Sequence, residues 1–327
     1  MAVDLLLLVV GLALLMLGGE AVVRGATGLA RALGVSPLVI GLTVVAFGTS
    51  APEMAVNIMA VLQGRSAISF GNIFGSNLAN IGLIVGCTAL IRPIQITGVV
   101  IAREIPMMLL ATTAAVIMGF DTLLGDPPDT YDRGDGLLLL MLFLVFLYYT
   151  VGDFVKRRAG AGNGLGADAA ERSGEGLRHP LLVTAAGLAA LIGGARITVS
   201  AAVGMARGLG VPEEVIALTL LAVGTSLPEL VASAVAMARG HSELAIGNVV
   251  GSNIFNLLFV LGVTSLISYV PVPPGGHLDL LLVALLSLIL FLSASTHTRT
   301  IVRTEALLLL VVYCGYIAWR SARSFGA

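Results

Sequence analysis

The sequence predicts an all-α membrane protein with ten transmembrane helices in two five-helix inverted-topology repeats, with broken helices at the centre. Composition is the first observation behind this prediction. Apolar residues make up 57% of the 327 residues, charged residues make up 11%, and mean hydropathy is +1.00, which lies outside the range of soluble proteins. A net charge of −1 without a basic tract argues against a nucleic-acid partner. The second observation is an internal repeat.

Ten apolar segments of roughly 18–29 residues are each long enough to cross a bilayer. Because there are five on each side of a polar break, an odd number, the second half must enter the membrane in the opposite orientation. The segments lie near 3–31, 37–62, 67–91, 98–119, 136–154, 180–208, 213–238, 243–269, 278–295 and 301–319.

The polar break divides the chain into a first repeat over 1–155, a cytoplasmic linker over 156–179 and a second repeat over 180–327. The linker is rich in Gly, Ala and charged residues, and it is expected to be flexible. Placing it in the cytoplasm puts about eleven basic residues on that side and about five on the other, as the positive-inside rule requires. We therefore expect a multi-pass protein of the cell membrane, with a retained first span and both termini outside.

The internal repeat joins Gly41–Gly86 to Ala217–Gly262 without a gap, with 18 identities in 46 aligned positions. The shared residues are mostly polar, although both stretches lie within apolar segments. Each copy contains Gly-Thr-Ser-x-Pro-Glu and, further on, Gly-Asn-x-x-Gly-Ser-Asn-x-x-Asn. A duplicated polar cluster in the membrane predicts a functional site built from both copies.

Glu53 and Glu229 are the strongest candidates for that site, because each lies in the middle of a span. An ionisable side chain at that depth costs about 3 kcal/mol on insertion scales, so a compensating partner is expected. The segments that contain these glutamates offer no Lys or Arg, which favours a bound cation. A protonated or structurally paired glutamate is the alternative.

Hydroxyl-bearing residues and a proline surround each glutamate. Proline removes a backbone donor and opens the helix, so that carbonyls near Ala46 and Ala222 would become available to an ion. Hydroxyl, carbonyl and carboxylate oxygens suit Na⁺ or Ca²⁺ and are poor ligands for zinc or copper. Alternatively, the hydroxyls bond back to the helix and proline only bends it. The residues concerned are Thr49, Ser50, Pro52, Thr225, Ser226 and Pro228.

The second motif places a serine and an asparagine four residues apart, on one face of a helix. These pairs, Ser76 with Asn80 and Ser252 with Asn256, are predicted to face the glutamates. The other asparagines of the motif are predicted to hold helices together. They are Asn72, Asn77, Asn248 and Asn253.

These motifs resemble those of the calcium/cation antiporter superfamily, specifically the prokaryotic type of the sodium/calcium exchanger family with two alpha-repeats. The resemblance covers essentially the whole chain. It implies exchange of Ca²⁺ for Na⁺ by alternating access, without enzymatic activity or a cofactor. The implied partners are the two ions and the lipid bilayer, with no obligate protein partner. The implied metal ligands are Ala46, Thr49, Ser50, Glu53, Ser76, Asn80, Ala222, Thr225, Ser226, Glu229, Ser252 and Asn256.

One feature departs from the family pattern: many relatives have aspartate where this chain has Asn80 or Asn256. The site would then carry two negative charges, which neutralise one Ca²⁺. Proton-coupled cation antiport is the alternative function, and a cation channel is a further one.

Charged residues outside the motifs are interpreted as structural. Glu20 and Arg24 are one helical turn apart and are expected to pair, and Arg196 occupies the position equivalent to Glu20 in the second repeat. The acidic loop from Asp121 to Asp135 is expected to be solvated.

Overall fold

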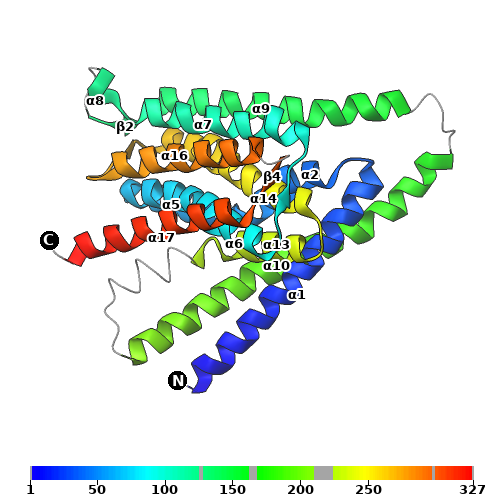
Figure 1. Ribbon diagram of the computed structural model, residues 1–327, viewed down its shortest axis with the longest axis horizontal. Helices are drawn as coiled ribbons and strands as arrows, with labels where there is room; N and C mark the ends of the chain where they lie inside the picture. The colour runs from blue at the N-terminus through cyan, green and yellow to red at the C-terminus, as the bar shows by residue number, and fades with distance from the viewer. Residues whose placement is uncertain (1, 125–127, 162–167, 210–223, 297–298, 326–327) are drawn as a thin grey trace.

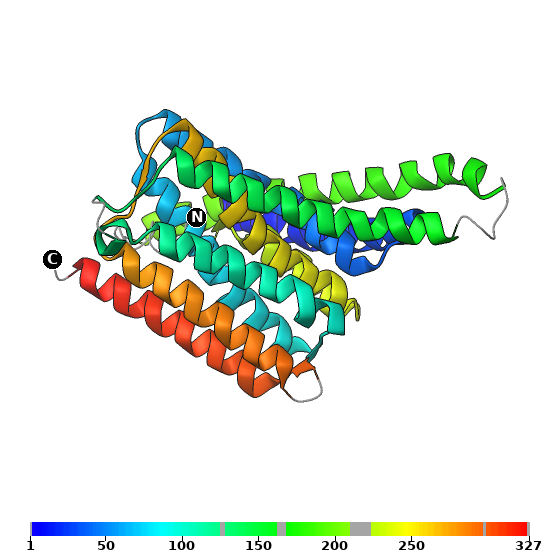
Figure 2. The same cartoon turned by 90° about the horizontal axis from the view of Figure 1, so that it is seen from above.

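The computed structural model describes residues 2–124, 128–161, 168–209, 224–296 and 299–325. Apart from four two-residue strands, the described elements are helical, which agrees with the predicted all-α membrane class. Most helices run side by side along the long axis of the molecule, while α1 (Ala2–Leu33) and α10 (Asp168–Gly208) cross them obliquely (Figures 1 and 2).

Seven described helices or helix combinations are long and apolar enough to cross a membrane. They cover Val3–Leu33, Ser66–Ile91, Val100–Met118, Arg133–Thr150, Gly176–Gly208, Ser242–Ile267 and Gly276–Ser295. An eighth candidate is the bent pair Pro37–Thr49 and Ala51–Leu62. The predicted span at 213–238 lies partly outside the described residues, and its described part is α13 (Leu227–Ala238). The last predicted span corresponds to α17 (Arg303–Phe325).

The centre of the molecule is formed by two matching helix pairs. In the first repeat these are α4 (Ala51–Leu62) and α5 (Ser66–Leu78), and α5 continues through the π-helical η2 (Ala79–Val85) into α6 (Gly86–Ile91). In the second repeat α13 is followed by α14 (Ser242–Ile254), η5 (Phe255–Val260) and α15 (Leu261–Ile267). At an offset of 176 residues, α13 has the same length as α4, and α14 has the same length as α5. The repeated sequence thus forms repeated structure.

Two short antiparallel ribbons mark opposite ends of the molecule. At one end β2 (Thr130–Tyr131) pairs with β3 (Val270–Pro271), beside the beginning of α5. At the other end β1 (Ile94–Gln95) pairs with β4 (Thr300–Ile301), beside α14. We call these the β2–β3 end and the β1–β4 end. Both ribbons join one repeat to the other.

The outer helices complete the bundle. The first repeat contributes η3 (Val100–Glu104), α7 (Ile105–Met118), the short α8 (Asp121–Leu124) and α9 (Arg133–Ala161). The second contributes α16 (Gly276–Ser295), which packs on α7 and α5. The broken span at the start of the first repeat consists of α2 (Pro37–Ile40), η1 (Gly41–Val45) and α3 (Ala46–Thr49).

Glycines bring α1 and α10 into very close contact. A Cβ atom built on Gly18 would lie 2.7 Å from the backbone nitrogen of Leu191, and one built on Gly194 would lie 2.8 Å from that of Leu15. Such distances leave room only for glycine, which is how small residues let helices approach in membranes. The two helices therefore form one tightly joined pair.

The predicted linker over 156–179 differs from the expectation of a flexible segment. Helix α9 continues to Ala161 and α10 begins at Asp168, so helix extends into the interval from both sides. Ala, Glu and Arg, which favour helix, dominate these extensions, and this preference outweighs the glycines. Residues 162–167 lie outside the described part of the chain.

Candidate cation-binding site

The first Gly-Thr-Ser-x-Pro-Glu motif breaks its helix in the middle of the span. Ser50 leaves helical geometry at φ −84° and ψ 1°, and the axes on either side of it are bent by 44°. Pro52 follows in the first turn of α4, where its missing N–H costs nothing. Glu53 occupies the same first turn. The predicted break is therefore confirmed in the first copy.

The second copy repeats this local geometry. Ser226 has φ −90° and ψ 6°, Pro228 lies in the first turn of α13, and Glu229 follows it. In both copies the motif thus places a carboxylate at the N-terminal end of a half-helix, deep in the molecule. The positive end of the helix dipole favours a carboxylate at this position.

Three side-chain hydrogen bonds join the motifs of one copy to those of the other. The Ser50 hydroxyl donates to Glu229 Oε1 over 3.1 Å. Thr49 Oγ1 donates to Asn248 Oδ1 over 3.3 Å, and Asn80 Nδ2 donates to Asn253 Oδ1 over 3.4 Å. Residues 173 to 199 positions apart therefore form one polar cluster at the centre of an apolar bundle.

The two glutamates in this cluster are almost completely enclosed. Glu53 is 2% exposed and Glu229 is 1% exposed. No Lys or Arg is buried anywhere in the part of the chain that the structure describes, so no basic side chain offsets their charge at that depth. Buried charge without a partner is costly, and a bound cation would remove the cost.

Several oxygens of the predicted ligands have no hydrogen-bond partner although they are buried. Such atoms are rare in native proteins and call for an explanation, of which a bound ion is one. They are Glu53 Oε2, Asn80 Oδ1, Ser226 Oγ, Glu229 Oε2, Ser252 Oγ and Asn256 Oδ1. All six are hard oxygen donors, and they come from both copies.

The remaining predicted ligands have partners in the structure or lie at the edge of the cluster. The Ala46 carbonyl, expected to be free, accepts a hydrogen bond from the Ser50 N–H at 3.0 Å. It also lies 3.3 Å from the Thr49 hydroxyl, whose single proton can bond either to this carbonyl or to Asn248 Oδ1. Ser76 Oγ contacts Asn72 Oδ1 at 3.4 Å. Thr225 is half-buried. Ala222 lies outside the described residues.

Of the four asparagines expected to hold helices together, Asn72 accepts the Ser76 bond within its own helix. The other three divide into two groups. Asn248 does so, because its Nδ2 donates to the Glu229 carbonyl and to Ser233 Oγ. Asn253 also does so, because it joins Asn80 to the Met108 sulfur. Asn77 is different: its Nδ2 donates to the Ile73 carbonyl, but its Oδ1 is buried without a partner. Sequence reasoning missed Asn77 as a candidate oxygen ligand.

The donor set limits the ions that fit. Among the described residues, no group of three or more His, Cys, Asp or Glu side chains is placed to hold a metal. The cluster instead combines two carboxylates with hydroxyl and amide oxygens, as hard cations such as Na⁺ and Ca²⁺ require.

Comparison with known proteins agrees with a cation site of this kind. The sequence matches the family described as "Sodium/calcium exchanger protein" over residues 3–152 and 179–322. It is 38% identical to "Putative antiporter CaxA" of Alkalimonas amylolytica over 97% of this chain and 98% of that protein. It is 32% identical to "Sodium/calcium exchanger MaX1" of Methanosarcina acetivorans over 96% of this chain and 97% of that protein.

The fold agrees with a solved structure from the same group. The sodium-calcium exchanger NCX_Mj, soaked with zero Na⁺ and Ca²⁺, superimposes with a TM-score of 0.82 at 33% sequence identity, covering 97% of this chain and 99% of that one. The buried oxygen cluster, the broken helix and these matches along nearly the whole chain lead to one conclusion. This chain is an integral, multi-pass membrane protein of the sodium/calcium exchanger family, within the calcium/cation antiporter superfamily.

Proposed function

We propose that this antiporter exchanges Ca²⁺ for Na⁺ by alternating access at the buried oxygen cluster between its two copies. The observation that carries the proposal is the set of six buried, unpartnered oxygens of the motif residues, one on each of the two glutamates and four on serine and asparagine side chains. MaX1, which matches this chain over nearly its whole length, and NCX_Mj, which also matches its fold, are named sodium/calcium exchangers, which supports the same pair of ions here.

The charge of the cluster is suited to this exchange. Glu53 and Glu229 together supply two negative charges, which one Ca²⁺ neutralises. Na⁺ has nearly the same radius, so several Na⁺ ions can share the same hydroxyl, amide and carboxylate oxygens. Without bound ions, two charged carboxylates would face an apolar interior while the protein changes from one state to the other. This electrostatic cost disfavours the conformational change in the empty protein. Coupling between the two fluxes follows from this electrostatic cost.

The proposed ligands are the twelve residues that the motifs identify, with Asn77 as an addition. Glu53, Ser76 and Asn80 of the first copy would face Glu229, Ser252 and Asn256 of the second. The hydroxyls of Thr49, Ser50, Thr225 and Ser226 and the carbonyls of Ala46 and Ala222 would complete the set.

The proposed architecture is ten spans in two inverted five-span repeats, over 1–155 and 180–327. The ribbons support it, because at the offset of 176 residues β1 corresponds to β3 and each pairs with a strand of the opposite repeat. The glycine contacts support it too, since Gly18 and Gly194 are equivalent positions with equivalent neighbours. We further propose a location in the cell membrane with both termini outside.

Flux measurements in proteoliposomes test the function. Vesicles preloaded with Na⁺ and diluted into Na⁺-free buffer should accumulate radiolabelled Ca²⁺, whereas K⁺-loaded vesicles should not. A pH jump without a Na⁺ gradient serves as the second control. Uptake driven by the pH jump alone would contradict sodium coupling and favour proton-coupled antiport. Uptake that needs no counter-ion gradient would indicate a channel.

A further inference from the structure

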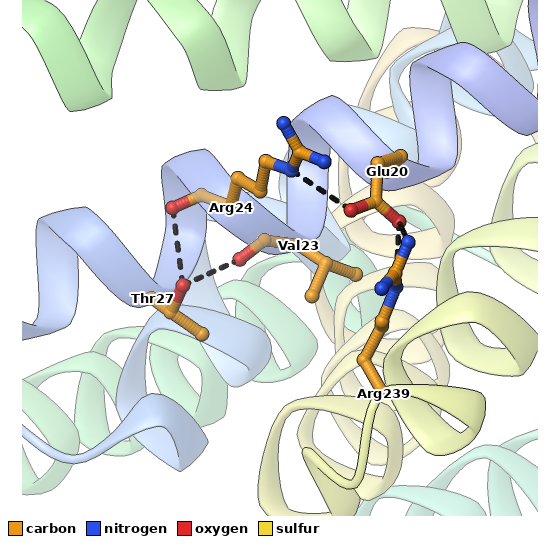
Figure 3. A network of polar contacts seen from close by, with 5 residues as sticks. All are labelled: Glu20, Val23, Arg24, Thr27 and Arg239. Carbon is orange, nitrogen blue, oxygen red and sulfur yellow. Dashed lines mark hydrogen bonds and ion pairs between the residues drawn. The ribbon is translucent and has the colours of Figure 1, made fainter.

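A three-residue ionic network ties α1 to the central helices at the β1–β4 end (Figure 3). Glu20 Oε2 accepts hydrogen bonds from Arg239 Nη2 at 2.8 Å and Nε at 2.9 Å, just beyond the end of α13. Glu20 Oε1 accepts one from Arg24 Nε, also at 2.8 Å, within α1. Only the bond to Arg239 joins two elements.

Close packing surrounds this ion pair. A Cβ atom built on Gly19 would lie 3.0 Å from Val231 Cγ1 and 3.0 Å from Val235 Cγ2, so the backbone of α1 rests directly on α13. Val235 is 8% exposed. On this side of the molecule α1 and α13 are in full contact.

The equivalent place in the other repeat is a cavity of about 720 Å³ between α4 and α10. Each residue of the α1–α13 contact has a counterpart 176 positions away in its wall. Gly19, Glu20 and Arg24 correspond to Ala195, Arg196 and Ser200, and Val231, Val235 and Arg239 correspond to Ala55, Met59 and Gln63. A contact that is closed in one copy is thus open in the other.

The cavity leads toward the cation site. Its wall also includes Thr225 and Pro228, which belong to the second Gly-Thr-Ser-x-Pro-Glu motif, and at its other limit lies Arg65, at the turn between α4 and α5. That turn faces the β2–β3 end, opposite the turn that carries Arg239 (Figures 1 and 2). The cavity thus includes residues from the second motif and from the turn at the β2–β3 end, whereas the equivalent place in the other repeat is filled by the α1–α13 contact.

The charges differ between the two places. Glu20 and Arg239 form an ion pair on the closed side, whereas the equivalent residues on the open side, Arg196 and the neutral Gln63, only line the cavity. Arg65 adds a second positive charge to its wall. No ion pair to Arg196 is found among the residues the structure describes. If the same contact formed between α10 and α4, no ion pair would hold it.

We propose that the Glu20–Arg239 ion pair is a one-sided latch, which closes the β1–β4 end and biases the protein toward the state open at the β2–β3 end. The inference rests on the proposed alternating-access function. Because glycine contacts join α1 and α10 into one unit, releasing α1 from α13 lets the pair move so that α10 closes on α4. Because Gln63 offers Arg196 no carboxylate, the α10–α4 contact lacks an equivalent ion pair, and the two states differ in free energy.

Cysteine accessibility tests the latch in the full-length protein in proteoliposomes. Cys87 and Cys314 are first replaced by alanine, and two equivalent reporters are then introduced separately, Met59→Cys and Val235→Cys. Met59 is 54% exposed and Val235 is 8% exposed, so a membrane-impermeant maleimide should modify the first reporter rapidly and the second slowly. Movement to the opposite state should exchange these rates.

The decisive variants are Glu20→Gln and Arg239→Gln, read at Met59→Cys because that position is remote from the altered charges. Each should shift the equilibrium constant between the two states about two- to fivefold, as expected for one partly exposed ion pair, and should thereby lower the labelling rate; the double variant should add nothing further. Arg24→Gln is the matched control, because it removes a bond to the same carboxylate within one helix. It should leave the rate unchanged.

A gain-of-function variant avoids the removal of any contact. Gln63→Glu would give Arg196 a carboxylate partner and so supply the missing latch, and it should raise the labelling rate of Val235→Cys. Elution as a single peak in size-exclusion chromatography shows that each variant is folded. Unchanged rates in Arg239→Gln, an equal effect in Arg24→Gln, or no response to Gln63→Glu would overturn the proposal.

Failure of the latch and failure of the proposed function give different results. If the rates shift as expected but no Na⁺-driven Ca²⁺ uptake is measured, the latch stands and the ion assignment fails. If Na⁺-driven uptake is normal and the rates do not shift, the function stands and the latch is wrong.

Discussion

The hydroxyl of Ser50 donates a hydrogen bond to Glu229 Oε1, 179 residues further along the chain. This bond connects the Gly-Thr-Ser-x-Pro-Glu motif of one copy directly to the glutamate of the other. Neither motif can therefore be regarded as a separate site. Any ion that binds Glu229 would also lie next to the break in the first copy, and a change in one copy should affect ion binding by both.

The first prediction concerns the two buried carboxylates. Glu53→Gln and Glu229→Gln each remove one of two negative charges from a site without other charged groups, so each should abolish Na⁺-driven Ca²⁺ uptake. The amide has nearly the same shape, so thermal unfolding should change little. Glu243→Gln, in the first turn of α14 and outside the site, is the control that should retain uptake. Normal exchange by either site variant would show that these glutamates do not bind the transported ion.

The second prediction uses the departure from the family pattern. Asn256→Asp adds a third negative charge at a buried oxygen that has no partner, so the apparent affinity for Ca²⁺ should increase. An increase of about tenfold corresponds to about 1.4 kcal/mol. Competition of Ca²⁺ with radiolabelled Ca²⁺ in equilibrium binding measures it. An unchanged affinity would place Asn256 outside the ligand shell.

The third prediction concerns the missed candidate, Asn77. Asn77→Ser keeps an oxygen but shortens the side chain and removes the Nδ2 bond to the Ile73 carbonyl. If Asn77 Oδ1 contacts the ion, Ca²⁺ affinity should fall by more than the stability of the protein accounts for. Thr88→Val is the control, because it likewise removes a side-chain bond to the carbonyl four residues earlier, that of Ile84, at a buried residue outside the site. Equal losses of affinity in the two variants would make the role of Asn77 structural.

Much of the fold could be predicted because membrane spans are long apolar segments, which can be recognised from hydropathy alone. The segment predicted at 67–91 is Ser66–Ile91 in the structure, and the one predicted at 98–119 is Val100–Met118. The break beside Pro52 was also predictable, because proline has a local effect on its own helix. The same holds for the Glu20–Arg24 bond, which depends only on a spacing of four residues.

What could not be predicted depends on contacts between distant segments. The second partner of Glu20 is Arg239, and no spacing rule connects residues 219 positions apart. The distinction between Asn77 and its equivalent Asn253 is of the same kind, since one motif position gives a buried oxygen without a partner in the first copy and an oxygen that accepts a bond from Asn80 in the second. The Ala46 carbonyl accepts the Ser50 N–H, so the break before Pro52 does not leave this carbonyl without a backbone partner. The ligand roles themselves stay predictions until ions are bound.

The last prediction tests the tight pairing of α1 with α10. Gly18→Ala would place a Cβ atom 2.7 Å from the Leu191 nitrogen and 2.9 Å from the Gly187 carbonyl oxygen, and backbone atoms cannot move aside as a flexible side chain would. The helices must separate, at a cost of about 1–3 kcal/mol. Gly193→Ala is the matched control on α10, because its Cβ atom would have no neighbour within 4 Å. Thermal unfolding in detergent should show a lower Tm for Gly18→Ala only, together with slower Ca²⁺ uptake. If both variants unfold at the temperature of the parent protein, α1 and α10 are not held together by this contact, and their movement as one unit would lose its physical basis.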